Sequence, residues 1–159
     1  MMPLIEDYGF LSDLHTSALV HRRGSIDWCC FPRFDSDACF TALLGGDEHG
    51  SWRLAPTAEG EATRHYREGS LVLETQWRTS SGRIRVLDFM PPRREAPTIV
   101  RIVEGLSGRV PLRSDLVIRF GYGRIVPWVS QVDQAWVASA GADALCLSTP
   151  RRLVAGTGR

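Results

Sequence analysis

Lysine is absent from this sequence, and all nineteen basic residues among its 159 are arginines. Arginine suits bidentate recognition of carboxylate, phosphate or sugar hydroxyl groups, although a GC-rich genome produces the same bias without selection on chemistry. The formal net charge is only +1, whereas nucleic acids and anionic membranes attract proteins with a basic patch or stripe. The composition therefore predicts no nucleic-acid partner.

A long apolar run is also missing. None approaches the ~20 residues that a membrane span requires, and the opening "MMPLIEDYGF" carries acids in place of the basic flank and apolar core of a signal peptide. Hydrophobic residues make up 43% of the chain and charged residues 23%, which is ordinary for a folded protein. We expect one main domain in a cytoplasmic protein without a membrane span.

The sequence offers little that could hold a metal or act as a nucleophile. The four cysteines are Cys29, Cys30, Cys39 and Cys146, and none forms a CxxC pair. Cys29 and Cys30 would point to opposite faces of a strand, and His15 and His21 lack metal-ligand spacing. No histidine lies close in sequence to activate a cysteine, and no GxSxG elbow is present. We expect buried thiols rather than disulfides, and no metal or cofactor.

Strand patterns dominate the chain. Residues 17–21 and 25–30 flank the turn "RRG", and residues 71–79 and 83–90 flank "SSG", so each pair predicts a β-hairpin. Further strand-like runs cover 98–106, 110–120, 123–129, 134–140 and 144–150. Nothing between them is long enough for a crossover helix. The pattern predicts an all-β, antiparallel β-sandwich of about ten strands.

Alternation and capping signals add detail to this sandwich. Over 71–79 the expected core face carries Leu71, Leu73 and Trp77, and the expected solvent face carries Glu74, Gln76 and Arg78. One short helix is predicted over 37–44, "DACFTALL", with Asp35 or Ser36 as its cap and Gly45-Gly46 as its end. After Pro150 the periodicity is lost, so 151–159 is predicted to be a linker or a truncated tail.

Four aspartates could in principle supply the paired carboxylates of glycoside hydrolysis. They are Asp27, Asp35, Asp37 and Asp88. Aspartate is also a common capping and turn residue, and it is favoured in the first turn of a helix. We favour structural roles for all four, and therefore predict no catalytic residue among them.

The opening "IEDYGFLSDLHTSALVHRRGSIDWCCFPRFDSDACFTALLG" closely resembles that of the bacterial trehalase and glucoamylase-like proteins of glycoside hydrolase family fifteen. The segments "HGSWRLAP", "RHYREGSLVLET", "VLDFMPP", "IVRIVEGLSGRVPLRSDLVIRFGYGR" and "VPW" follow in the same order, so the resemblance covers residues 4 to about 150. It implies an N-terminal β-sandwich of the supersandwich type over 1–150, followed by a linker and an (α/α)6 barrel that holds two catalytic glutamates. Twelve helices of ~11 residues would need far more chain than follows residue 150.

The resemblance therefore implies a non-catalytic domain of an enzyme acting on α-glucosidic bonds, in trehalose or in malto- and isomalto-oligosaccharides. Its expected partner is the catalytic barrel of the same protein, with contact to an α-glucoside as a further expectation. In "DWCCFPRFDS" we expect an interface near the substrate entrance, formed by Trp28, Arg33, Phe34 and Asp35 and joined by Trp128. Alternatively this stretch only closes the sandwich, or the chain is a free-standing carbohydrate-binding module that displays Trp128 and Trp136.

Overall fold

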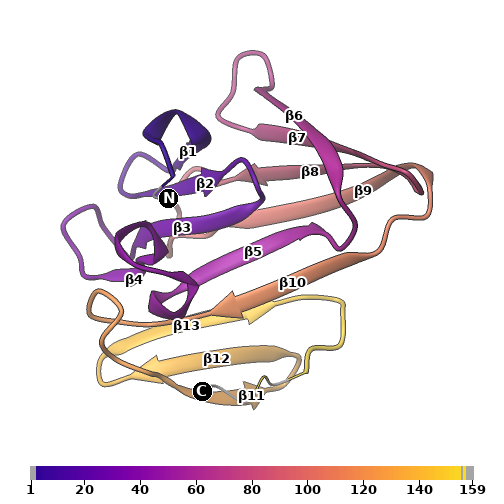
Figure 1. The fold of residues 1–159 in the computed structure, drawn as a ribbon. Coiled ribbons are helices and arrows are strands. Elements are labelled where there is room, and N and C mark those ends of the chain that lie inside the picture. Colours follow the sequence, from indigo (N-terminus) through magenta and orange to yellow (C-terminus); the bar gives the residue numbers. More distant parts are fainter. Residues whose placement is uncertain (1–2, 155, 157–159) are drawn as a thin grey trace.

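The computed structural model describes residues 3–154 and 156, and β-strands account for most of their regular structure (Figure 1). The strands are β1 (Tyr8–Ser12), β2 (Ser17–His21), β3 (Ser25–Cys30), β4 (Ala38–Phe40), β5 (Ser51–Pro56), β6 (Gly60–Tyr66), β7 (Leu73–Thr79), β8 (Gly82–Phe89), β9 (Val100–Gly108), β10 (Leu112–Val117), β11 (Trp128–Val132), β12 (Ala135–Ala140) and β13 (Asp143–Ser148). Three single-turn 3₁₀ helices accompany them: η1 (Ile5–Asp7), η2 (Ala42–Leu44) and η3 (Asp47–His49).

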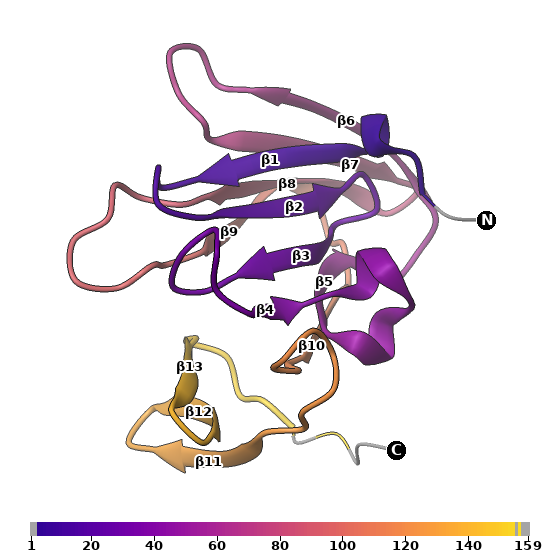
Figure 2. The same cartoon turned by 90° about the vertical axis from the view of Figure 1, so that its left-hand side faces the viewer.

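The strands form three antiparallel sheets. The first sheet has the order β1-β2-β3-β5-β10, with β4 also paired to β3, and the second has the order β6-β7-β8-β9. In Figure 2 strands β1 and β2 lie in front of the fainter β7 and β8, so the first two sheets face each other as layers. The third sheet, β11-β12-β13, lies beyond β10 (Figure 1). The predicted all-β, antiparallel sandwich is confirmed.

The core lies between the first two sheets. Leu11, Val20 and Ile26 of the first sheet and Leu73 of the second are each at most 2% exposed and belong to one apolar cluster. Burying a side chain of this size stabilises the fold by about 1.5–3 kcal/mol. Alternation in β1 and β2 explains the arrangement, because every second residue faces inward.

Both predicted hairpins are present. β2 pairs antiparallel with β3, and β7 pairs with β8 from Leu73 opposite Asp88 to Thr79 opposite Gly82. The cysteines are free thiols, and three are buried as predicted. Cys146 is the exception, because it lies exposed on β13, which has a neighbour only on the β12 side.

The helix predicted over 37–44 is wrong. Ala38, Cys39 and Phe40 form β4, and all three are at most 3% exposed. Cys29 of β3 pairs with Phe40, which adds residues 38–40 to the first sheet. Side chains on both faces of this strand are buried, whereas a helix on the surface would bury only one of its faces. Only Ala42–Leu44 is helical, as the turn η2. Asp35 therefore caps no helix, and its side chain instead pairs with Arg33.

The alternation predicted over 71–79 is correct in part. Leu73 is buried and Trp77 packs against the second core cluster, but Leu71 precedes the strand and is 45% exposed. Glu74 lies on the opposite face, yet it is only 4% exposed. Its carboxylate accepts hydrogen bonds from Gln76 and Arg67 at 2.9 and 3.0 Å. The hydrogen bonds from Gln76 and Arg67, together with the positive charges of Arg85 and Arg67, outweigh burial and lower the pKa of Glu74.

A buried ion pair joins the two layers. Arg101 of β9 donates to both carboxylate oxygens of Asp88, at 2.8 and 3.3 Å, and both side chains are at most 2% exposed. The same guanidinium donates to the backbone oxygens of Trp52 and Gly24 in the first sheet, at 2.6 and 2.8 Å. It also lies 5.2 Å from the centroid of the Trp52 ring, a cation–π contact. Asp88 thus has the structural role that the sequence favoured.

Beyond the sandwich, residues 151–154 and 156 contain no helix or strand. The remainder of the predicted linker, residues 155 and 157–159, lies outside the described residues. The described residues contain no helix of the length and hydropathy needed to cross a lipid bilayer.

Candidate functional site

The loop between β3 and β4 carries three of the five predicted site residues. The Nε of Arg33 lies 3.0 Å from Oδ1 of Asp35, and their side chains are 69% and 76% exposed. The hydrogen bond from Arg33 lowers the pKa of the Asp35 carboxyl. Phe34 is 55% exposed, while its backbone N–H donates to the oxygen of His15 at 3.0 Å. The loop therefore presents an aromatic ring and an ion pair to the outside.

Trp28, the fourth predicted residue, contacts a side chain that sequence reasoning missed. Its ring centroid lies 6.3 Å from that of Tyr122, with 41° between the ring planes. Tyr122 stands between two glycines, and all three residues have positive φ angles, of 59°, 59° and 88° from Gly121 to Gly123. A positive φ is uncommon for a tyrosine. The Gly-Tyr-Gly run was the one signal in the sequence that could have indicated this turn.

The surrounding contacts hold this turn in place. The N–H of Tyr122 donates to the oxygen of Ala38 at 3.3 Å. A Cβ on Gly123 would come within 3.0 Å of both Thr41 and His49, so a side chain there would displace its neighbours. An unusual backbone conformation that its surroundings enforce is typical of functional positions.

Trp128, the fifth predicted residue, begins β11 in the third sheet and is 86% exposed. Trp136 lies on β12 and is partly buried. The structure thus brings Trp28 together with Tyr122 and pairs Arg33 with Asp35. Trp128 belongs to another sheet and shares no aromatic contact with these residues in the described part of the chain.

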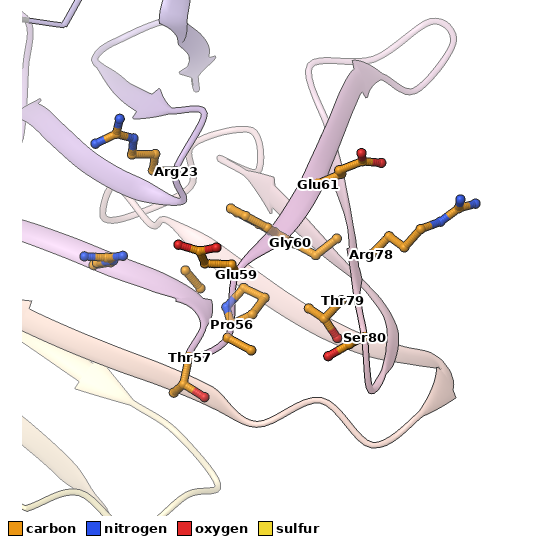
Figure 3. A pocket seen from close by; sticks show the side chains of 13 residues that line it. Arg23, Pro56, Thr57, Glu59, Gly60, Glu61, Arg78, Thr79 and Ser80 are labelled. Carbon is orange, nitrogen blue, oxygen red and sulfur yellow. The ribbon is translucent and has the colours of Figure 1, made fainter.

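An open hollow of about 900 Å³ lies where β5, β6 and the β7–β8 turn meet (Figure 3). Both charge signs line it, since Arg23, Arg78, Glu59 and Glu61 all contribute. The side chains of Arg23 and Arg78 extend away from each other on opposite sides (Figure 3). Trp77 also lines the hollow, but its Nε1 is buried without a hydrogen-bond partner among the described residues. The charges do not converge on one point, so the hollow does not resemble a binding site for a charged ligand.

Three of the four candidate carboxylates are engaged by other side chains, Asp27 by Tyr8, Asp35 by Arg33 and Asp88 by Arg101. Asp27 is 8% exposed and accepts a hydrogen bond from the hydroxyl of Tyr8 at 2.9 Å. Burial and this hydrogen bond raise the pKa of Tyr8. Asp88 is committed to Arg101, and Asp37 lies exposed in the loop before β4. Within the described ranges no group of three or more histidine, cysteine and acidic side chains converges to hold a metal.

Together these features define an antiparallel β-sandwich domain with buried acids in structural pairs and aromatic side chains on its outer surface. The family described as trehalase-like, N-terminal, matches residues 1–152, and the chain belongs to this family. The predicted resemblance is thereby confirmed. No solved structure matches the chain.

Curated relatives give the same result. A trehalase of Mycolicibacterium smegmatis is 36% identical over 77% of this chain and 21% of its own length. A trehalase of Thermoplasma volcanium is 28% identical over 92% of this chain and 25% of its own length. Trehalase 2 of Sulfolobus acidocaldarius is 33% identical over 75% of this chain and 19% of its own length. The chain thus spans about a fifth to a quarter of the length of these relatives.

Proposed function

We propose that this chain acts as the non-catalytic N-terminal domain of a trehalase-type enzyme that hydrolyses α-glucosidic bonds. Residues 1–150 form the β-sandwich, and 151–159 lead toward a catalytic barrel of the same polypeptide. The domain packs against that barrel near the substrate entrance and stabilises it. The family match over residues 1–152, in a chain that spans only about a fifth of its relatives, carries this proposal.

The use of acidic side chains within the fold supports a non-catalytic role. Glycoside hydrolysis needs two carboxyl groups on opposite sides of the bond to be cleaved. Here the buried carboxylates of Asp13, Glu74 and Asp88 each pair with an arginine, at 2.8, 3.0 and 2.8 Å. A carboxylate whose oxygens already accept hydrogen bonds from an arginine within the fold is not free to protonate a leaving group, so none of the three fits the role of a general acid.

A carbohydrate-binding module is the second candidate. The 86% exposure of the Trp128 side chain favours it, because sugar rings stack on displayed aromatic side chains. Trp136 is partly buried, which weakens the pair of tryptophans expected for such a module.

Activity and binding assays separate the two functions. We expect the purified chain to show no turnover of trehalose, maltose or isomaltose, while the full-length polypeptide that carries it is active. Turnover by the chain that survives repurification and disappears in Asp27→Asn or Asp35→Asn would contradict a non-catalytic role. Titration calorimetry with malto-oligosaccharides tests the second candidate. Heat of binding that is lost in Trp128→Ala and retained in Trp28→Ala would favour the binding module.

A further inference from the structure

The face of the first sheet that points away from the core carries a continuous apolar stripe. Phe10 of β1 pairs with Leu19 of β2, and Leu19 pairs with Trp28 of β3. Their chain neighbours Leu11, Ala18 and Cys29 are completely buried in the core, so the three side chains share the opposite face. Tyr122 extends the row through its contact with Trp28. We call Phe10, Leu19, Trp28 and Tyr122 the outer stripe.

The outer stripe is open at both ends. Phe10 and Tyr122 are each 43% exposed, and Leu19 and Trp28 between them are partly exposed. Polar residues border it. On one side the rings of Tyr8 and His21 pack at 5.2 Å, and on the other side Ser12 pairs with Ser17. Along β1 and β2 the apolar surface is therefore one residue wide, with polar residues on both sides.

Its position is fixed before any partner arrives. The hydroxyl of Tyr66 accepts from the N–H of Phe10 at 2.7 Å and donates to its oxygen at 3.1 Å, which closes the free edge of β1. At the other end the Gly-Tyr-Gly turn is held against Ala38. A surface that is already ordered loses less conformational entropy on binding.

The dimensions of the stripe match one helix. The length of the outer stripe can be added up from Phe10 to Tyr122. Phe10 and Trp28 are two strand spacings apart, each about 4.8 Å, and the Trp28 and Tyr122 rings are 6.3 Å apart, which together give about 16 Å. At 1.5 Å per residue, this is the length of about three helical turns. An amphipathic helix presents an apolar stripe with polar borders of this kind. A sugar fits less well, because Phe10 and Leu19 offer no hydrogen bond to its hydroxyl groups.

We propose that the outer stripe is the docking surface for one amphipathic helix of the catalytic domain, a proposal that rests on the proposed function. The matched part of this chain covers only 19–25% of the length of three relatives, so most of each relative lies outside the region matched here. The remainder of such a polypeptide is the occupant to which the proposal commits.

The test measures the accessibility of single thiols. Phe10→Cys and Tyr122→Cys are made in a Cys146→Ser background, because Cys146 is the exposed thiol among the four cysteines. Maleimide labelling is compared between the 159-residue chain and the full-length polypeptide that carries it. We expect labelling at both positions to be several-fold slower in the full-length protein. Arg78→Cys, on the exposed face of β7 in the second sheet, is the matched control and should label equally fast in both.

The other outcomes overturn the proposal in distinguishable ways. In one outcome, labelling is unchanged at Phe10→Cys and Tyr122→Cys but slower at Phe34→Cys in the full-length protein. The domain would then dock through the β3–β4 loop, and the proposed function would stand without the outer stripe. No protection at any of these positions would contradict the docking role as well. Protection in the 159-residue chain that increases with its concentration would identify a second copy as the occupant. If Tyr122→Cys unfolds the chain, Phe10→Cys still decides.

Discussion

Arg101→Met tests the ion pair that joins the two layers. The substitution keeps much of the apolar stem of Arg101 and removes its guanidinium, which leaves the buried carboxylate of Asp88 without its partner. The backbone oxygens of Trp52 and Gly24 lose a donor at the same time. Removing one partner of a buried ion pair costs about 3–5 kcal/mol.

The matched control is another arginine in an ion pair of the same length. Arg113 lies 2.8 Å from Asp115, but their side chains are 74% and 44% exposed. An exposed pair contributes about 0–1 kcal/mol, so Arg113→Met should change stability little. For a domain of about this size 1 kcal/mol corresponds to roughly 2–4 °C in Tm, and Arg101→Met should therefore lower Tm by about 6–20 °C.

Urea denaturation followed by tryptophan fluorescence measures both variants. A third variant, Asp88→Leu with Arg101→Met, should recover part of the loss, because apolar replacement of both partners removes the unpaired charge. Recovery should stay incomplete, since the oxygens of Trp52 and Gly24 still lack their donor. Equal midpoints for Arg101→Met and Arg113→Met would refute the reasoning.

Three further predictions follow from burial and charge. Trp77 is partly buried against the second core cluster, so Trp77→Ala should cost about 3 kcal/mol, the lower end of the range for truncating a buried aromatic, and Arg78→Ala on the exposed face less than about 0.5 kcal/mol; equal melting shifts would show that the strand faces are assigned wrongly. Burial alone raises the pKa of Asp13, but hydrogen bonds from an arginine and two backbone N–H groups outweigh it and lower the pKa. Asp13 therefore stabilises the fold above its unfolded pKa of about 3.9 and loses this effect as pH falls through the lower folded pKa. Asp13→Asn should be destabilised at pH 7 and approach the parent in acid, which unfolding curves across pH can check. Arg33→Ala and Asp35→Ala should leave the Tm of the isolated 159-residue chain unchanged and reduce kcat/KM of the full-length polypeptide. A strongly lowered Tm with normal kinetics would mean that the β3–β4 loop only closes the sandwich.

Alternation and turn residues were sufficient to predict the sandwich and both hairpins. They failed where neighbours in space decide the structure. The run 37–44 has the cap and glycine signals of a helix, but its central residues pair with Cys29 and Cys30 and therefore form strand β4. The run 123–129 was expected to be one strand, yet Ile125 bridges back to Phe120 and β11 begins only at Trp128. Burial of Glu74 likewise depends on Arg67 and Gln76, whose positions the alternation does not reveal.

The candidate site shows the same limit. Trp28, Arg33 and Asp35 follow one another in the first half of the chain, so a local motif was enough to select them. Tyr122 reaches Trp28 only because its turn hydrogen-bonds to Ala38 beside β3. No local pattern connects these positions, and the outer stripe depends on the pairing register of β1, β2 and β3.

The pairing of β5 with β10 has a consequence for the order of folding. These strands lie side by side (Figure 1), but the whole second sheet, β6 to β9, stands between them in the sequence. Closing so long a loop costs chain entropy before any contact compensates for it, whereas the hairpins of the second sheet need only local closure. During synthesis the edge of β5 that faces β10 must stay unpaired until Val117 has left the ribosome, so we expect the amides on this edge to gain protection from hydrogen exchange after those of the second sheet. A nascent chain stalled before β10 would expose that edge to other chains, which makes this interval the step at which aggregation competes with folding.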